Sequence, residues 1–223
     1  MHPDSKKNKF LFAVALTVLC CTTFFSCTAD EELTQKPVSD EYISIAREIL
    51  QDSIVVNATA MQGTVNKTLL DEGCPLKYYL KWKSETSDML NIQLKGFSVG
   101  KMPVTIWFSI NCKFMQLNTW EKEEYTGDGW IKFQGTGGST RYTGNQNDEE
   151  GSYESGDGGA GSVTGYFNAK TNEIEFVTNF NVMNMSSDVY LQKVDPTRID
   201  RFETDFAQYE KDLAEYKKEH GIK

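Results

Sequence analysis

Side chains that could perform acid–base or metal chemistry are scarce in this sequence of 223 residues. Its two histidines, His2 and His220, stand near opposite ends of the chain. Serine and cysteine hydrolases usually need a histidine base held inside the fold, and catalytic zinc sites usually take two or three histidines. Histidines at these positions cannot be held in that way, so both classes of enzyme are excluded.

Acidic residues are abundant, with 32 Asp and Glu against 23 Lys and Arg. A glycosidase needs two carboxyl groups at a set separation, but no acidic pair here stands out from a solvated surface. No glycine-rich phosphate loop or dinucleotide-binding motif follows a predicted strand. We therefore expect a protein that is not an enzyme and has no cofactor. The net charge of −9 repels phosphate backbones, so nucleic acid is not an expected partner.

An acidic, glycine-rich run covers residues 145–159. Its carboxylates are Asp148, Glu149, Glu150, Glu154 and Asp157. Calcium prefers closely spaced carboxylates and backbone oxygens, but the ligand spacing of a calcium-binding EF-hand is absent. We therefore predict a long solvated loop over residues 134–161 and no metal site, with calcium binding as the alternative.

Four tryptophans are the candidate ligand-binding residues: Trp82, Trp107, Trp120 and Trp130. Small-ligand sites are mostly apolar with a few polar groups, and aromatic rings can stack on sugars or contact lipids. Tyr79 and Tyr125 could add to such a surface. The alternative is that most of these rings fill the core, because aromatic side chains bury the most apolar area.

Two cysteines in the part of the chain after residue 27, Cys74 and Cys112, lie in strand-like runs. An even pair in an oxidising compartment is a candidate for a disulfide bond. Buried free cysteine is also a common core residue, so both states stay open.

The N-terminus has the pattern of a secretion signal. Lys6, Lys7 and Lys9 precede an uncharged stretch whose densest apolar part covers residues 10–19, the length of a signal peptide core. The sequence Phe24-Phe25-Ser26-Cys27 resembles the bacterial lipobox, in which a small residue precedes the lipidated cysteine. This resemblance implies that residues 1–26 are a lipoprotein signal peptide and that Cys27 is acylated. A plain signal peptide cut near Ala29 is the alternative.

Residues 27–38 form an acidic tether. Its cluster Asp30-Glu31-Glu32 resembles the surface-export signal of lipoproteins from the Bacteroidetes phylum. The resemblance implies an outer-membrane protein, lipid-anchored and at the cell surface, with the membrane as its partner. An acidic spacer without an export role is the other interpretation.

The remaining residues, 39–223, are predicted to form a single β-rich domain flanked by two amphipathic helices. Apolar residues recur at helical spacing over residues 39–51, where Ser39 or Asp40 can cap the helix, and again after Asp195 and Pro196. The second apolar stripe runs from Ile199 to Tyr216. It could form a coiled coil, but packing on a sheet is favoured for so short a stripe.

Between the helices, alternation predicts antiparallel strands. They cover residues 54–60, 76–83, 90–99, 104–117, 129–134, 162–168, 173–182 and 188–194. A hairpin turn is expected at residues 169–172. No long helix interrupts the series, so the fold is mainly β, either an antiparallel β-barrel or a β-sandwich.

The lipobox-like Cys27, the acidic cluster and the hairpin sequences Gly165-Tyr166-Phe167 and Glu173-Ile174-Glu175-Phe176 resemble uncharacterised surface lipoproteins of gut Bacteroidetes. Some of those have calycin-like barrels related to lipocalins. Our leading hypothesis is a non-enzymatic envelope lipoprotein that binds a small lipid or glycan through aromatic side chains or serves as an accessory protein. The alternative is an interaction subunit of a surface assembly that docks through the C-terminal helix or a strand edge. The oligomeric state stays open.

Overall fold

The structure of the protein, a computed structural model, describes residues 37–147 and 157–222. The predicted signal peptide, Cys27 and the acidic cluster at residues 30–32 lie outside these ranges. The same holds for Asp148, Glu149, Glu150 and Glu154, so the calcium alternative has no structural description.

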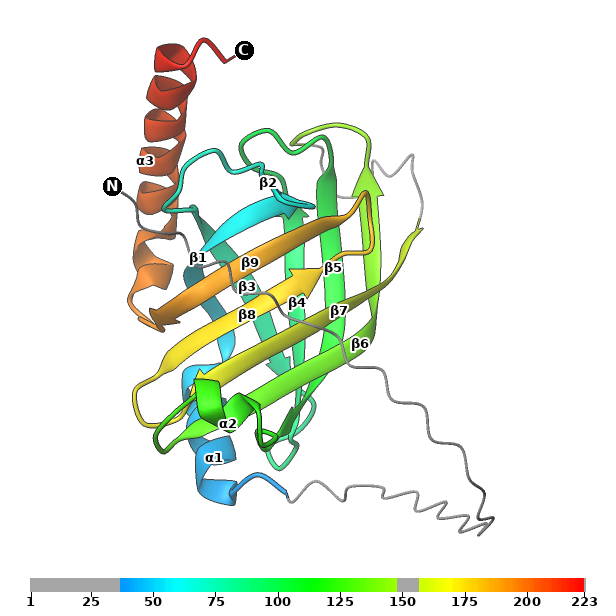
Figure 1. The fold of residues 1–223 in the computed structure, drawn as a ribbon, viewed down its shortest axis with the longest axis vertical. Coiled ribbons are helices and arrows are strands. Elements are labelled where there is room, and N and C mark those ends of the chain that lie inside the picture. The colour runs from blue at the N-terminus through cyan, green and yellow to red at the C-terminus, as the bar shows by residue number, and fades with distance from the viewer. Residues whose placement is uncertain (1–36, 148–156, 223) are drawn as a thin grey trace, which may run out of the picture. The chain divides into compact units, whose positions relative to one another are not determined.

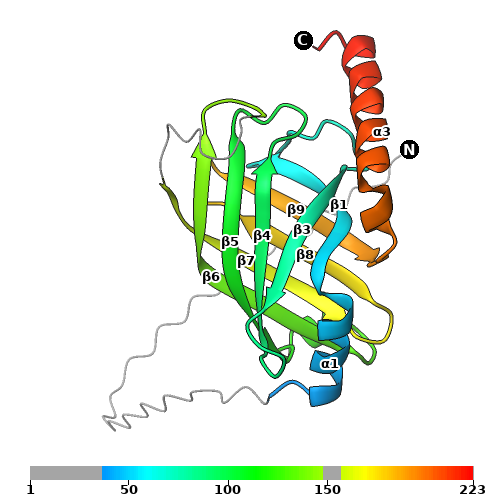
Figure 2. The same ribbon diagram turned by 180° about the vertical axis from the view of Figure 1, so that it is seen from behind.

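Within the described ranges, eight antiparallel strands close into a barrel, as Figures 1 and 2 show. The barrel strands are β1 (Asp52–Gln62), β3 (Cys74–Trp82), β4 (Met89–Phe97), β5 (Thr105–Met115), β6 (Trp130–Thr143), β7 (Asp157–Asn168), β8 (Glu173–Asn179) and β9 (Met185–Lys193). A two-residue strand, β2 (Val65–Asn66), pairs with the end of β1. Pairing of β1 with β9 completes the circle, so the fold is the predicted barrel and not a sandwich.

Because side chains alternate between the two faces of a strand, every second side chain points into the barrel. On β5, for example, Ile106, Phe108 and Ile110 belong to the core. The five largest fully buried side chains are aromatic: Tyr78, Phe114, Phe133, Phe167 and Phe180. Edge contacts between these rings, such as the 4.9 Å between the centroids of Tyr78 and Phe176, give the interior a packed aromatic core.

The predicted loop over residues 134–161 is wrong at both ends, because β6 continues to Thr143 and β7 starts at Asp157. Glycines made this part of the sequence look like a loop. In the barrel they provide room for aromatic rings, since a Cβ on Gly138 or Gly161 would lie only 2.9 or 2.5 Å from the ring of Phe108. Such close approach is a common reason for glycine inside a strand.

Helix α1 (Asp40–Ile49) covers one end of the barrel (Figure 2). Of the two predicted caps, Ser39 and Asp40, it is Ser39 whose side chain accepts a hydrogen bond from the backbone N–H of Tyr42. Ala46 and Leu50 are fully buried in the core. The end of the barrel near α1 is therefore closed by apolar packing.

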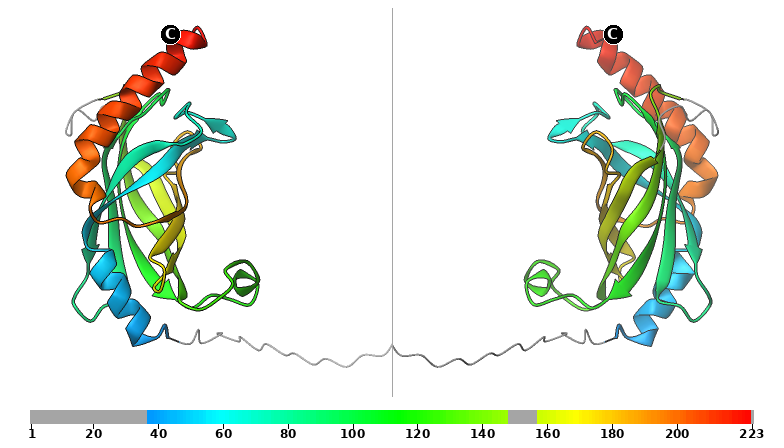
Figure 3. Two further views of the ribbon diagram at one scale, coloured as in Figure 1. Left: turned by 90° about the vertical axis from the view of Figure 1, so that its left-hand side faces the viewer. Right: turned by 90° about the vertical axis from the view of Figure 1, so that its right-hand side faces the viewer.

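Helix α3 (Arg198–Glu219) packs on the outside of β1 and β3, and Figure 3 shows it on the side of the barrel opposite the short helix α2 (Glu121–Glu124). Tyr209 and Leu213 of the predicted stripe are buried, which favours packing over a coiled coil. The helix begins later than predicted, after Thr197, while the Asp195 carboxylate accepts hydrogen bonds from the backbone and hydroxyl of Thr197. No helix in the described residues is both long and apolar enough to span a membrane.

Candidate ligand-binding site

A pocket of about 330 Å³ lies where α1, the α2 segment and the start of β6 meet. We call it the end pocket. The residues that define it are Tyr42, Leu117, Tyr125, Asp128 and Trp130. One aromatic ring from α1 and two from the segment that runs from the end of α2 to the start of β6 therefore surround one cavity with a carboxylate at its rim.

Asp128 lies at the tip of a tight turn between Gly127 and Gly129. Both glycines have positive φ angles, of 92° and 99° respectively, which few other residues adopt. The backbone N–H of Gly129 donates a 2.9 Å hydrogen bond to Asp128 Oδ1. The turn therefore fixes the direction of the carboxylate.

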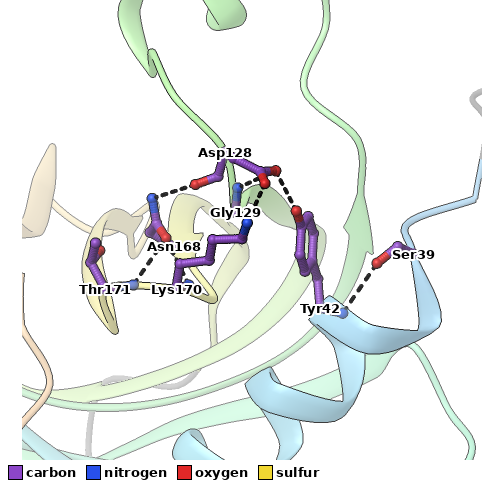
Figure 4. Close-up of polar contacts among 7 residues, drawn as sticks. All are labelled: Ser39, Tyr42, Asp128, Gly129, Asn168, Lys170 and Thr171. Atoms are coloured by element: carbon purple, nitrogen blue, oxygen red, sulfur yellow. Dashed lines mark hydrogen bonds and ion pairs between the residues drawn. The ribbon is translucent and has the colours of Figure 1, made fainter.

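Two side chains from distant parts of the sequence bind this carboxylate, as Figure 4 shows. The hydroxyl of Tyr42 donates to Asp128 Oδ1, and the ammonium group of Lys170 pairs with Asp128 Oδ2. Tyr42 comes from α1 and Lys170 from the β7–β8 hairpin. Asp128 thus links the helix that covers the barrel end to a hairpin of the barrel wall.

Asn168 holds this hairpin in place. Its side-chain oxygen accepts hydrogen bonds of 2.8 and 3.1 Å from the backbone N–H groups of Lys170 and Thr171. Its amide nitrogen donates to the backbone oxygen of Asp128 at 3.3 Å. Asn168 is buried, so the position of Lys170 opposite Asp128 is set by an internal amide.

Hydrogen bonding also sets the charges at the rim. The hydrogen bonds from Lys170 and Tyr42 lower the pKa of Asp128 below its ordinary value. The hydrogen bond to Asp128 raises the pKa of Tyr42 and that of Lys170. At neutral pH the rim therefore carries a carboxylate, an ammonium group and a neutral phenol.

Tyr125 and Trp130 form the aromatic wall of the end pocket, with their ring centroids 5.0 Å apart. Tyr125 also stacks on Tyr166 of β7 at 3.9 Å and donates its hydroxyl hydrogen to Glu175 of β8. Burial, followed by the hydrogen bond to Glu175, raises the pKa of Tyr125. The ring is held from both sides, so the wall is formed before any ligand arrives.

An ion pair anchors the α2 segment to the barrel wall. Lys132 of β6 and Glu121 of α2 approach within 2.5 Å, and both side chains are largely buried. The hydroxyl of Tyr166 donates to the same carboxylate at 3.0 Å. Burial opposes ionisation of Glu121, but hydrogen bonds, first from Lys132, then from the Asn118 backbone and Tyr166, lower its pKa overall. These contacts keep Tyr125 in position over β7.

Comparison with known proteins assigns the chain to a family. A family model described as "Domain of unknown function (DUF4903)" matches residues 27–221. The chain belongs to the DUF4903 family. No curated protein and no solved structure matches it. The DUF4903 match includes all the strands and helices described above, and it agrees with the expected barrel protein of uncharacterised function.

The four tryptophans do not form one site in this DUF4903 domain. Trp130 lines the end pocket. Trp120, at the start of α2, is 78% exposed and does not line this pocket. Trp82 packs between α1 and the core, stacked on Phe114 and donating to the backbone oxygen of Leu50. Trp107 is buried on the outer wall of β5. Sequence spacing alone could not separate these environments.

Cys74 and Cys112 are both free and buried, so the disulfide alternative is not realised in the DUF4903 barrel. Strand register gives the reason. Cys112 is in register with Leu90, and Leu90 with Trp82, which is the last residue of β3, whereas Cys74 is the first. Eight residues of extended strand span about 27 Å, far beyond the reach of a disulfide.

Two polar residues of the site, Asp128 and Lys170, were not predicted from the sequence. The Gly127-Asp128-Gly129 turn is a recognisable signal for a fixed loop, but nothing local reveals that Lys170 and Tyr42 face it. Within the described residues, no group of three His, Cys, Asp or Glu could hold a metal ion. The site can therefore offer stacking surfaces, hydrogen bonds and a paired charge.

Proposed function

We propose that this protein is a non-enzymatic lipoprotein of the cell envelope that binds a small glycan in the end pocket. The observation that carries the proposal is the convergence of Tyr42, Tyr125 and Trp130 on one cavity with Asp128 at its rim. A volume of about 330 Å³ falls within the range of small-ligand sites. Sugars offer apolar faces to aromatic rings and hydroxyl groups to carboxylates.

A glycan fits the described barrel better than a lipid does. Barrels that carry lipids hold them in an interior cavity, whereas this interior is filled by large side chains such as Tyr78, Phe133 and Phe167. The end pocket is instead open to solvent and edged by Asp128 and Lys122. A long acyl chain offers no hydrogen-bonding group to these charged side chains, whereas the hydroxyl groups of a sugar do.

Location at the outer membrane is part of the same proposal. The signal-like residues 1–26 and the lipobox-like Cys27 support it, and the family match starts at Cys27. Metabolic labelling with a palmitate analogue tests it. Wild-type protein should incorporate the label and Cys27→Ala should not. Equal labelling of both proteins would contradict the proposed acylation of Cys27.

Binding to the end pocket is tested with a panel of neutral oligosaccharides by titration calorimetry. Trp130→Ala should weaken binding at least about tenfold, because it removes one stacking surface worth roughly 1.4 kcal/mol. Trp120→Ala is the matched control, since its ring is exposed and does not line the pocket. Failure of every oligosaccharide to bind, or unchanged affinity of Trp130→Ala, would contradict the proposal.

Docking through a strand edge or the C-terminal helix has less support. The barrel strands close on one another, and the central residues of the helix stripe, Tyr209 and Leu213, are buried against the barrel. Light scattering of the protein with and without residues 196–223 tests this alternative. A multimer that is lost on truncation would favour it.

A further inference from the structure

Two adjoining cavities lie on the outer wall of the barrel over β3, β4, β5 and β6, the strands that face the viewer in Figure 2. One cavity, of about 140 Å³, lies between α3 and the strands β3 and β4, and the other, of about 230 Å³, crosses β4, β5 and β6. They share Leu94 and Lys95. We call this surface the basic groove and define it by Lys77, Tyr79, Gln93, Lys95 and Ser109.

Two ammonium groups converge on one ring in the basic groove. Lys95 Nζ lies 4.0 Å from the ring centroid of Tyr79, and Lys77 Nζ lies 5.4 Å from the same centroid. Tyr79 pairs with Gln93, and extending this register by two residues brings Lys77 opposite Lys95. Like charges directly opposite each other on neighbouring strands destabilise a sheet.

Among the residues that the structure describes, nothing acidic compensates this pair of charges. None of their Asp or Glu side chains lines either cavity of the basic groove. Within the described residues, neither Lys77 nor Lys95 has a carboxylate within the 4.0 Å that defines an ion pair. In a chain of net charge −9, an uncompensated cationic pair is conspicuous. An anionic group placed between the two ammonium ions would relieve their repulsion.

A β-bulge directs Lys95 into the groove. The register of β4 against β5 shifts between Leu94 and Phe97, and Gly96 within this shift has a φ of 68°. Bulges re-aim side chains and are common next to functional sites. Lys95 is exposed, and its ammonium group lies over the ring of Tyr79.

The other half of the basic groove suits hydroxyl groups. Gln93, Ser109 and Ser139 line it, and these side chains both donate and accept hydrogen bonds. Trp107 and the cationic Arg141 line the same cavity. A ligand that spans both halves would offer an anionic group to the two lysines and hydroxyl groups to Gln93, Ser109 and Ser139.

We propose that the basic groove binds an acidic oligosaccharide, with a carboxylate or sulfate between Lys77 and Lys95 and sugar hydroxyls on Gln93 and Ser109. A flat anionic membrane fits the groove less well, because the two lysines lie over Tyr79 in a recess lined by Phe202 of α3. This second site is separate from the end pocket and shares no lining residue with it.

Titration of the chain without its predicted signal peptide, residues 27–223, with tetragalacturonate at low salt tests the proposal. Maltotetraose is the uncharged comparison. We expect tetragalacturonate to bind the wild type and its dissociation constant to rise with salt. The double variant Lys77→Gln, Lys95→Gln should weaken binding at least about tenfold. Lys81→Gln, an exposed lysine on the same strand that does not line the groove, should change it less than twofold.

Three results would overturn the proposal. They are no binding of tetragalacturonate by the wild type, unchanged affinity of the double variant, and equal weakening by Lys81→Gln. Sedimentation with phosphatidylglycerol vesicles, lost in the double variant, together with no binding of tetragalacturonate, would assign the groove to a membrane surface instead. Trp130→Ala should keep its affinity for tetragalacturonate, so failure of the end-pocket proposal is distinguishable from failure of this one.

Discussion

The side chain of Gln192 forms two hydrogen bonds with the backbone of Asn57, accepting from its N–H and donating to its carbonyl oxygen, each at 2.8 Å. The β1–β9 ladder that closes the barrel runs only over Thr59–Gln62 and Met185–Asp188, so Asn57 lies just beyond its end. The Gln192 carboxamide there replaces the peptide group of a paired strand. One side chain thus extends the β1–β9 pairing that closes the barrel.

Substitution of Gln192 tests this role in stability. Gln192→Ala should lower the free energy of unfolding by about 1–3 kcal/mol, because two backbone groups of Asn57 lose their partner. Gln192→Glu keeps the acceptor and loses the donor at neutral pH, so its effect should be intermediate. Urea denaturation measures both. Gln208→Ala, on the exposed face of α3, is the control and should stay within about 0.5 kcal/mol of the wild type.

The ion pair at the rim of the end pocket should make stability depend on pH. The pKa of Asp128 is lowered in the folded state by Lys170 and Tyr42. Its contribution is therefore fully present above the unfolded pKa of about 3.9 and is lost as the pH falls through the lower folded pKa. Asp128→Asn should differ most from the wild type near pH 6 and progressively less toward pH 2. A constant difference over this range would contradict the assignment.

Glycine inside the barrel is predicted to be needed for packing. A Cβ on Gly165 would lie 2.3 Å from the ring of Phe133 and 2.4 Å from Phe176. Gly165→Ala should therefore lower the free energy of unfolding by about 1–3 kcal/mol. Gly144→Ala is the matched control, since nothing lies within 4 Å of its Cβ position, and should be neutral or slightly stabilising. Adding Phe133→Leu should recover part of the loss in the Gly165 variant.

Thiol reactivity should report the buried state of Cys74 and Cys112. Burial raises the pKa of each thiol to about 12, so neither is a thiolate at pH 8. We expect iodoacetamide to modify both residues only after unfolding, with or without prior reduction. Peptide mapping by mass spectrometry gives the extent of modification. Modification in urea that requires prior reduction would indicate a disulfide.

The sequence alone predicted the class of fold well. Alternation identified part of every barrel strand, and helical spacing identified α1 and α3, because each pattern follows directly from the geometry of a strand or a helix. A helix cap at Ser39 or Asp40 and the 169–172 turn were also predicted, since both depend on contacts within a few residues. The parts of β6 and β7 that fall within the predicted loop were missed, because glycine is typical of turns and the aromatic ring beside it is not known from the sequence.

Tertiary structure decided everything that depends on distant residues meeting. Closure of β1 on β9 selected barrel over sandwich, and strand register separated Cys74 from Cys112. The Asp128–Lys170 pair and the convergence of Lys77 and Lys95 on Tyr79 likewise arise from folding. Local patterns fix which side of a strand a residue occupies, whereas register across the sheet fixes its neighbours, and those neighbours make the sites.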